Sequence, residues 1–490
     1  MIWITLFLGL NLTGARIVMI SADSDPALHR RLGEWIIQHR AIVHEDVLLH
    51  TYHGSSMAKE WLSEVLFAST GRLFGWNGFV LLAATVIATC FWLLHHQLLA
   101  EGCDALLAAV LVLVAMLACS MHWLARPLLF THLLILIYAW QLRRFQQQRA
   151  SARQLFLLLP PLMVLWVNLH GGFVLGLVLL AMYAIGNSIE AWRQPIRPGK
   201  SRTLLVLLLV CSLASLANPS GWKLHAQILD FMRSRELSTA TTEFASPNFH
   251  TVGMRGFLLL LLLLGAALLI IRPRLDATDV LLVGGWGCFA LLSARNVPIF
   301  ALIVTPLLAQ WINEFLQAND HSRWCRLYRG WVSRVITSNG TAGTAIVIAV
   351  VAGVMLVMAK PAIAGGAPVL VTDFPPDRYP TAVVGYLRAH PDMVRGEMFN
   401  YFLWGGYLEF AIPERKPFID SRNVLYGLNL LHDFRTINEP KPGWQALFAR
   451  YNVGWTLLPV QHPLNRILEL SPHWSLVFSN QQALVFSHVP

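Results

Sequence analysis

Two aspartates stand one residue apart in the segment Asp23-Ser24-Asp25-Pro26, directly after the first apolar stretch of the chain. Two carboxylates this close can bind a divalent cation such as Mg²⁺ or Mn²⁺ through oxygen ligands, or one of them can act as a general base. The structural alternative is a helix cap, because Asp before Pro is a good start for a helix. Spacing alone favours the cap, but the residues that follow support the chemical interpretation.

The segment from Ala27 to Arg40 has the pattern of an amphipathic helix that lies in a membrane interface. Its apolar positions (Leu28, Leu32, Trp35, Ile36) alternate with basic ones (His29, Arg30, Arg31, Arg40). Such a helix can hold a lipid-borne substrate beside the two carboxylates, and His29 and Arg31 are its candidate binding residues. A second helical pattern, with one apolar and one polar face, begins near Glu60.

Further polar clusters stand where apolar stretches end. Taken singly, each is better explained as a helix cap or an internal ion pair, but ionisable groups near a membrane are costly unless they are used or paired. Several clusters assigned to one membrane face favour a common site, and arginine suits bidentate phosphate contacts. The candidates for binding a donor phosphate or another part of the substrate are Arg126, His170, Glu243, Asn248, His250, Arg295 and Asn296.

The composition requires these groups to be positioned by membrane helices. Hydrophobic residues make up 56% of the 490 residues and charged residues only 13%, which is far from the balance of a soluble protein. This predicts a polytopic α-helical membrane protein. Eleven apolar stretches are interpreted as spans, although several are shorter than a full bilayer crossing. They lie near residues 2–20, 73–95, 104–123, 127–142, 155–169, 171–187, 203–217, 256–271, 278–293, 298–316 and 343–360.

Arginine and lysine residues set the expected orientation. They fill alternate loops between the apolar stretches, with Arg143, Arg193, Arg272 and Arg323 as examples, and such loops are cytoplasmic by the positive-inside rule. The N-terminus is then cytoplasmic and the C-terminus extracytoplasmic. The net charge of +10 is scattered over these loops, so it indicates contact with membrane lipids rather than with nucleic acid.

The chain divides into residues 1–360, a transmembrane domain with a first extracytoplasmic loop at 21–72, and residues 361–490, a small extracytoplasmic α/β domain. Strand-like runs near 368–371, 406–412, 417–420, 453–459, 474–478 and 483–487 alternate with helical patterns near 380–389, 428–436 and 444–451. In this tail, Trp404, Tyr407, Asp420 and Arg422 can bind a sugar acceptor. The alternative, an aromatic core with a buried Asp–Arg pair, is the preferred one.

Several motifs occur in order over most of the chain. They are Asp23-x-Asp25, His29-x-Arg31-x-Gly33-Glu34-Trp35, Asp46, Glu60-Trp61-Leu62, Asn168-x-His170-Gly171-Gly172, Asn218-Pro219, Glu243-Phe244-x-x-Pro247-Asn248 and Arg295-Asn296-x-Pro298. This set resembles bacterial GT-C-type membrane glycosyltransferases, a superfamily that includes protein O-mannosyltransferases, aminoarabinose transferases and oligosaccharyltransferases. The tail segment from Phe399 to Arg422 resembles the tail of the same family.

The resemblance implies a fold, a donor and a location. Family members use polyprenyl-phosphate-linked sugars and act at the outer face of the bacterial cytoplasmic membrane, with an acidic residue of the first loop at the active centre. It makes Asp25 the expected base, and Asp23 its partner or a metal ligand. The expected activity is an inverting transfer of one sugar to a cell-envelope acceptor, which is a lipid, a polysaccharide or a protein.

This hypothesis needs the first-loop carboxylates to share a cavity with the cationic and amide groups of later helix ends. Two alternatives remain open. A transporter or flippase for lipid-linked sugars would also place charges along a helix bundle, although neither internal symmetry nor acidic pairs in mid-span are apparent. A catalytically silent scaffold would present its tail to envelope partners.

Overall fold

The computed structural model describes residues 2–55, 59–193, 199–234, 242–319, 321–337 and 372–489. These residues form two compact units, and neither is continuous in sequence. The first comprises 1–15, 81–221 and 242–369, and the second comprises 16–80, 222–241 and 370–490. The first-loop residues thus group with the tail, although the domain boundaries from the sequence follow chain order. Those predicted boundaries stay a prediction.

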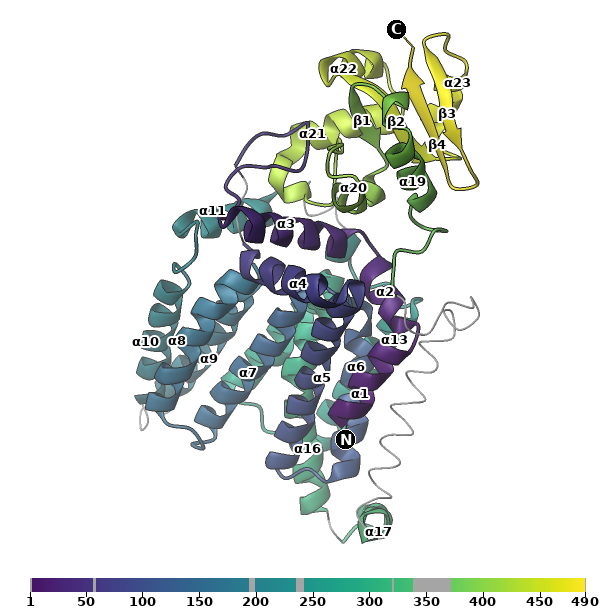
Figure 1. Ribbon diagram of the computed structural model, residues 1–490. Helices are drawn as coiled ribbons and strands as arrows, with labels where there is room; N and C mark the ends of the chain where they lie inside the picture. Colours follow the sequence, from purple (N-terminus) through teal and green to yellow (C-terminus); the bar gives the residue numbers. More distant parts are fainter. Residues whose placement is uncertain are drawn as a thin grey trace. The chain divides into compact units, whose positions relative to one another are not determined.

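The first unit is a bundle of apolar helices. Its longer apolar helices in the described residues are α1 (Ile2–Leu12), α5 (Trp76–Ala100), α6 (Ala105–Cys119), α7 (Leu128–Gln146), α8 (Ala152–Leu169), α9 (Phe173–Arg193), α10 (Gly199–Ala214), α13 (Val252–Ala266) and α16 (Val297–Ala318). Helix α17 (Arg323–Thr337) is amphipathic and rich in arginine. Neighbours in this bundle lie side by side, with α6 against α13 and α16, and α9 against α7 and α10 (Figure 1). Short elements join them: η1 (Ser120–His122), η2 (Thr242–Phe244), η3 (Ala267–Ile271), α14 (Ala277–Val280), η4 (Leu281–Gly285), α15 (Trp286–Leu292) and η5 (Ala294–Asn296).

In the described part of the chain, six helices are long and apolar enough to cross a membrane: 76–100, 105–122, 152–169, 173–193, 253–271 and 294–318. The expected first span is a bent pair, α1 and α2 (Ala15–Ser21), with 70° between its halves, and it gives a seventh crossing if the pair counts as one. The span expected near 278–293 is a shorter apolar helix, and its path includes a π-helical turn. The eleventh expected span, 343–360, lies outside the described residues. The predicted number of eleven spans is therefore not confirmed by the described residues and stays a prediction.

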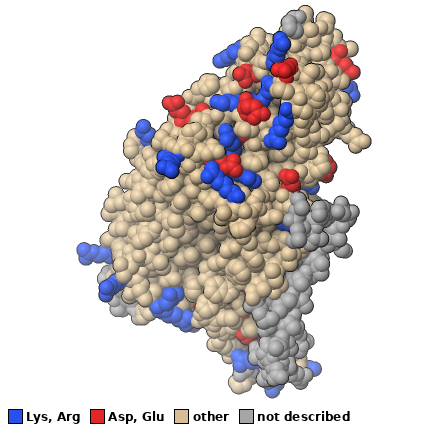
Figure 2. Space-filling model, viewed as in Figure 1, with Lys and Arg blue, Asp and Glu red and all other residues tan. Residues whose placement is uncertain are grey.

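Figure 2 shows how charged side chains are distributed over one face of the molecule. On the face toward the viewer, a broad band over the helix bundle carries hardly any charged side chains, and Lys and Arg gather near its lower end. An uncharged band flanked by basic residues is the pattern expected of helices that cross a bilayer.

The second unit holds α3 (Asp25–His39), α4 (Trp61–Phe74) and α11 (Trp222–Arg233) together with the tail. Helices α3 and α4 lie side by side (Figure 1). Apolar residues of α3 form their own cluster with the following loop, comprising Leu28, Leu32, Ile36, Val43 and Leu48. This is the spacing of a single helix face, so the predicted amphipathic helix forms and buries its apolar side.

The tail contains a four-stranded sheet in the order β1-β2-β4-β3. Strands β1 (Glu397–Asn400) and β2 (Val453–Pro459) are parallel, and β4 (Ala483–His488) pairs antiparallel with β2 and with β3 (Trp474–Ser479). The helical elements around it are α19 (Thr381–Ala389), η6 (Pro391–Met393), η7 (Phe402–Trp404), α20 (Gly405–Ala411), α21 (Asn423–Asn438), α22 (Trp444–Arg450) and α23 (Pro463–Glu469).

Three strands of the tail were expected at their observed places, and two expected strands are wrong. Residues 406–412 belong to helix α20, and 417–420 form no strand. The buried residues Tyr407, Leu408 and Ala411 have helical spacing, which the sequence pattern did not distinguish from a buried strand. The run at 368–371 lies outside the described residues.

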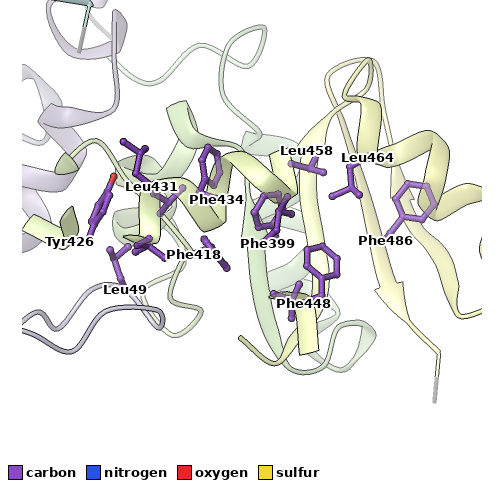
Figure 3. Packing of buried hydrophobic residues seen from close by; sticks show 14 of the residues in the cluster. Leu49, Phe399, Phe418, Tyr426, Leu431, Phe434, Phe448, Leu458, Leu464 and Phe486 are labelled. Atoms are coloured by element: carbon purple, nitrogen blue, oxygen red, sulfur yellow. The ribbon is translucent and has the colours of Figure 1, made fainter. Parts of the chain in front are cut away.

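The core of the second unit joins the first loop to the tail. Leu49 packs with Phe399, Phe418, Tyr426 and other buried residues of the tail in one hydrophobic cluster. Figure 3 shows Leu49 beside Phe418, and Phe399 between the helices and the strands. Backbone contacts reinforce this packing, because the amide of His50 donates to the carbonyl of Pro417 at 3.3 Å.

Candidate active site

Asp25 is the first residue of α3, and the following Pro26 suits a first helical turn. The side-chain Oδ1 of Asp23 accepts a hydrogen bond from the amide of Asp25 at 3.0 Å. Asp23 thus closes a turn at the helix start, although the N-cap residue itself, Ser24, makes no side-chain capping hydrogen bond. The helix N-terminus also favours the ionised form of a carboxyl group in its first turn.

A residue of the tail holds the Asp25 carboxylate. The hydroxyl of Ser421 donates a hydrogen bond to Asp25 Oδ1 at 2.5 Å. Ser421 can reach it because α20 packs closely on α3, where a Cβ on Gly406 would lie 2.7 Å from the carbonyl oxygen of Ser24. Gly405 and Gly406 thus permit a close approach to other parts of the chain. The result is a half-buried carboxylate with a fixed orientation.

Arg422, the residue after Ser421, is the centre of a buried ionic cluster. Its guanidinium contacts Asp420 at 2.5 Å, Asp46 at 2.7 Å and Glu409 at 3.6 Å. Asp46 also accepts hydrogen bonds from the amides of Leu48 and Leu49. These four residues, named here the Arg422 cluster, tie the first loop to the tail. Asp46 was expected only through the family resemblance, and Glu409 was not expected at all, because its partners are distant in sequence.

The tail aromatics that were candidates for sugar binding are buried. Trp404 is 4% exposed and Tyr407 7%. The indole of Trp404 donates to the carbonyl of Arg378 at 2.9 Å, and Tyr407 packs against Phe374 and Tyr379. Together with the Asp420–Arg422 pair, this arrangement favours packing over contact with a sugar, so an acceptor-binding role for these residues stays a prediction.

His29 and Arg31 lie on α3, and their environments differ. His29 is buried, and its Nδ1 lies 3.6 Å from Glu64 Oε1 of α4. Arg31 is half-buried, and its Nε has no hydrogen-bond partner in the described part of the chain. His29 therefore faces the neighbouring helix, and its expected role as a substrate-binding residue stays a prediction.

In the first unit, three expected residues form one ion-pair cluster. Arg126 Nη1 contacts Glu243 Oε1 at 2.6 Å, and Arg295 Nη1 lies 3.6 Å from Glu243 Oε2. The backbone fixes this arrangement, since the amide of Ala294 donates to the carbonyl of Ala245 at 2.9 Å and thereby joins η2 to η5. We name Arg126, Glu243 and Arg295 the Glu243 cluster. The sequence identified its members but not their pairing, because Arg126 and Glu243 are 117 positions apart.

The two arginines keep Glu243 ionised. Burial alone would raise the pKa of this carboxyl group, but the charges of Arg126 and Arg295 outweigh the burial and lower its pKa to about 2. At neutral pH the cluster thus holds one negative and two positive charges. Its remaining positive charge makes it a candidate site for an anionic group.

His170 follows α8 and is held as a hydrogen-bond acceptor at Nδ1. The Gly172 amide donates to this nitrogen at 3.0 Å, and Thr131 Oγ1 lies 2.8 Å away. Thr131 also accepts a hydrogen bond from the indole of Trp166. A Cβ on Gly172 would lie 2.6 Å from Thr131 Oγ1, so glycine is required at this place. In the neutral imidazole, this pattern leaves the proton on Nε2.

The remaining candidates of the first unit have local structural contacts. Asn248 Oδ1 accepts from the amide of His250 at 3.0 Å in the turn before α13, and both side chains are exposed. Asn296 precedes α16 and donates to the carbonyl of Phe289 at 3.2 Å. Substrate binding by Asn248, His250 and Asn296 stays a prediction.

The candidate residues therefore fall into two groups. Asp23, Asp25, His29 and the Arg422 cluster belong to the second unit, and the Glu243 cluster and His170 belong to the first. Each group is assembled from residues that are distant in sequence. The shared cavity that the sequence analysis expected for the two groups stays a prediction.

The described residues bring three metal-ligating side chains together, but not at the expected place. His29, Glu60 and Glu64 have ligand atoms within 4.8 Å of one another. Neither Asp23 nor Asp25 belongs to this group, and one oxygen of each carboxylate already accepts a hydrogen bond from the chain. A metal ion held by Asp23 and Asp25 stays a prediction.

The fold is similar to that of two solved membrane proteins. The archaeal oligosaccharyltransferase AglB from Archaeoglobus fulgidus, in complex with an inhibitory peptide and a dolichol-phosphate, matches with a TM-score of 0.59 and 12% identity over 100% of this chain and 74% of its own. ArnT from Cupriavidus metallidurans bound to undecaprenyl phosphate matches with a TM-score of 0.51 and 14% identity over 100% of this chain and 96% of its own. Its apo state gives a TM-score of 0.52.

No protein-family model and no curated protein matches the sequence. At 12–14% identity, these two similarities show a shared fold, so the resemblance drawn from the motifs is confirmed at the level of the fold. The apolar helices and this fold together indicate a multi-pass membrane protein.

Proposed function

We propose that this protein is an inverting glycosyltransferase that uses a polyprenyl-phosphate-linked sugar as donor. The observation that carries the proposal is Asp25, a half-buried carboxylate at the start of α3 whose orientation is fixed by Ser421. The fold supports it, since the two similar structures contain dolichol-phosphate and undecaprenyl phosphate.

Asp25 has the properties of a general base. A base must keep an oxygen within reach of the acceptor, and its carboxylate must be held in place. Ser421 occupies Oδ1, and the hydrogen bond from a neutral hydroxyl leaves the charge on the carboxylate. The positive end of the α3 dipole stabilises the ionised form that accepts a proton.

In the first unit, the Glu243 cluster has the charge that a phosphate leaving group would need. Arg126 and Arg295 share one carboxylate, so the cluster keeps one net positive charge. Preorganised cations are effective because the phosphate gains negative charge as the glycosidic bond breaks. His170, with its proton directed to Nε2 by the contacts at Nδ1, is a further donor of the first unit.

The reaction then proceeds in one displacement. The acceptor hydroxyl or amide attacks the anomeric carbon of the donor sugar while its proton passes to the Asp25 carboxylate. The bond between the anomeric carbon and the phosphate oxygen breaks, and the polyprenyl phosphate leaves with the electron pair. The configuration at the anomeric carbon inverts because the attack and the departure occur on opposite faces.

The acceptor class follows from the proposed location. An orientation with basic loops in the cytoplasm places the first loop and the tail at the outer face of the bacterial cytoplasmic membrane. The acceptor is then a cell-envelope lipid, polysaccharide or protein. Mg²⁺ or Mn²⁺ at Asp23 and Asp25 would supply additional positive charge for the phosphate.

The test is a comparison of cell-envelope glycans between the parent strain, a deletion strain and deletion strains that carry variants of the gene. We expect Asp25→Asn to lose the glycan change that the wild-type gene restores, with a rate at least about a hundredfold lower because a general base contributes roughly 10²–10⁴ to a rate. Mass spectrometry of envelope lipids, polysaccharides and proteins would identify the sugar and the acceptor together.

Glu34→Gln is a matched control, because Glu34 also lies on α3 but pairs with Arg30 at 2.9 Å. This variant should restore the glycan fully. Membrane levels of each variant are compared by immunoblot. If Asp25→Asn is present at the wild-type level and restores the glycan as well as wild type does, the enzymatic role of Asp25 is wrong. If that variant still moves lipid-linked sugar across vesicles, the flippase alternative is correct.

A further inference from the structure

His29, Glu60 and Glu64 form a cluster that the proposed sugar transfer does not use. One ligand atom from each side chain lies within 4.8 Å of the others. His29 comes from α3, Glu64 from α4, and Glu60 immediately precedes α4. All three residues belong to the second unit. They bring one imidazole and two carboxylates to one place, although the sequence separates His29 from the two glutamates by a long loop.

The histidine nitrogen in this cluster lacks a hydrogen bond. His29 is 7% exposed, and its buried Nδ1 has no hydrogen-bond partner among the described residues. Glu64 Oε1 lies 3.6 Å from it, just beyond hydrogen-bond reach. A buried polar atom without a hydrogen bond costs about 1–3 kcal/mol, so its presence beside two carboxylates needs an explanation.

We propose that His29, Glu60 and Glu64 bind a divalent transition-metal ion, with Zn²⁺ as the best match. Around a tetrahedral zinc ion with bonds of roughly 2.0–2.2 Å, ligand atoms lie about 3.3 Å apart. The separation of 3.6 Å between His29 and Glu64 is close to this value, and small side-chain rotations would bring in Glu60. Mg²⁺ and Ca²⁺ fit less well, because they prefer all-oxygen sites with six or more ligands.

The electrostatics of the cluster favour a cation. The carboxylates of Glu60 and Glu64 lie beside the imidazole of His29 and bring negative charge to the cluster. The cluster therefore attracts positive charge even without a metal ion. Lys59 is the nearby basic residue, and its Nζ lies 3.9 Å from Glu60.

The backbone of α3 and α4 holds the ligands at this spacing. Gly33, one turn after His29, lies so close to α4 that a Cβ would meet the carbonyl oxygen of Glu64 at 2.0 Å. A metal ion bound here would cross-link the two helices. Because Asp25 is one turn before His29 on the same face of α3, the ion would also fix the part of the helix that carries the proposed base.

The test is metal binding by the purified full chain in detergent, prepared without a polyhistidine tag and stripped with a chelator. We expect one equivalent of Zn²⁺ per chain by elemental analysis and calorimetry, and a visible absorption spectrum when Co²⁺ is bound instead. His29→Gln, Glu60→Gln and Glu64→Gln should each weaken binding at least about tenfold. His39→Gln is the matched control, since His39 is an exposed histidine of the same helix, and it should bind as wild type does.

Glu60→Gln keeps the test decisive if the more buried variants fail to fold, because the Glu60 side chain is 12% exposed at the edge of the cluster. Folding of each variant is checked by gel filtration and thermal unfolding. The proposal is overturned if wild type binds no Zn²⁺, or if folded Glu60→Gln binds one equivalent with unchanged affinity. The readout is metal content, so its outcome is independent of sugar transfer.

Discussion

Glu409 shows how burial changes the pKa of a single residue in this protein. Its side chain is fully buried, and neither carboxylate oxygen has a hydrogen bond within the described residues. Burial first, and then the negative charge of Asp420, raises the pKa of Glu409 well above its ordinary value, although Arg422 opposes the shift. The Arg422 cluster therefore contains a carboxyl group whose pKa is higher in the folded state than in the unfolded state.

This difference in pKa predicts the direction of a pH effect. Between the unfolded and the folded pKa of Glu409, the folded state holds one more proton than the unfolded state, so stability decreases as the pH rises, by about 1.4 kcal/mol per pH unit at most. Glu409→Gln imitates the protonated form and removes the pH-dependent contribution of Glu409 to the free energy of unfolding. We expect its thermal midpoint to exceed that of wild type increasingly as the pH rises from 5 to 8, measured by tryptophan fluorescence in detergent.

Glu414→Gln is the control for this prediction, because Glu414 is an exposed glutamate close by in the sequence. Its difference from wild type should not change with pH. A constant difference between Glu409→Gln and wild type over the same range would show that Glu409 is ionised in the folded protein.

The residue types of both groups were predictable, but their partners were not. Asp25, Arg126, Glu243 and Arg295 stood out because charged residues beside apolar stretches are costly unless they are paired or used. The pairing of Arg126 with Glu243 depends on how distant helix ends meet. His29 was expected to contact substrate, whereas the structure directs it toward Glu64, which no local pattern indicates.

At the scale of elements, the contact between α3 and α4 depends on one small residue. A Cβ on Gly33 would lie 2.0 Å from the carbonyl oxygen of Glu64 and 2.7 Å from the Cβ of Ala68. Backbone atoms cannot rotate away, so even a methyl group requires the helices to separate. Gly385 in α19 offers the opposite case, because nothing lies within 4 Å of its hypothetical Cβ.

Alanine at these two glycines should therefore have effects of opposite sign. We expect Gly33→Ala to destabilise the protein by about 1–3 kcal/mol through overpacking, and Gly385→Ala to stabilise it by roughly 0.5–1 kcal/mol through helix propensity. Thermal midpoints, measured with a chelator present so that no metal ion contributes, would give both values. Equal stabilisation by the two changes would mean that α3 and α4 are farther apart than described.

Element types were predicted well where the apolar period was long and poorly where it was short. The helix beginning at Asp25 was expected from its alternation of apolar and basic residues, and it forms. The run at 406–412 was too short to separate a helix from a buried strand. Strand β1 and helix α23 were missed, since four residues and seven residues carry little periodic signal.

At the scale of the whole molecule, composition predicted a helical membrane protein but not the grouping of its parts. The sequence was divided at one boundary near residue 360, whereas the compact units combine segments from three regions of the chain. Chain order gives no signal for such a grouping, because it depends on long-range packing. Leu49 is an example, as it is fully buried among residues of the tail.

This packing predicts that the tail depends on the first loop. A fragment of residues 372–489 lacks Leu49 and also loses the contacts of His50 with the carbonyl of Met398 at 3.0 Å and of Thr51 with the carbonyl of Phe418 at 2.6 Å. Truncation of a buried leucine costs about 2–5 kcal/mol, so the fragment alone should bind the dye ANS and unfold at low denaturant concentration.

A peptide of residues 41–55, added in trans, should reduce ANS binding and raise the denaturation midpoint, whereas the same peptide with Leu49→Asp should do neither. A fragment whose stability is unaffected by the wild-type peptide would show that the tail folds independently, and the core would then have to be assigned to the tail alone.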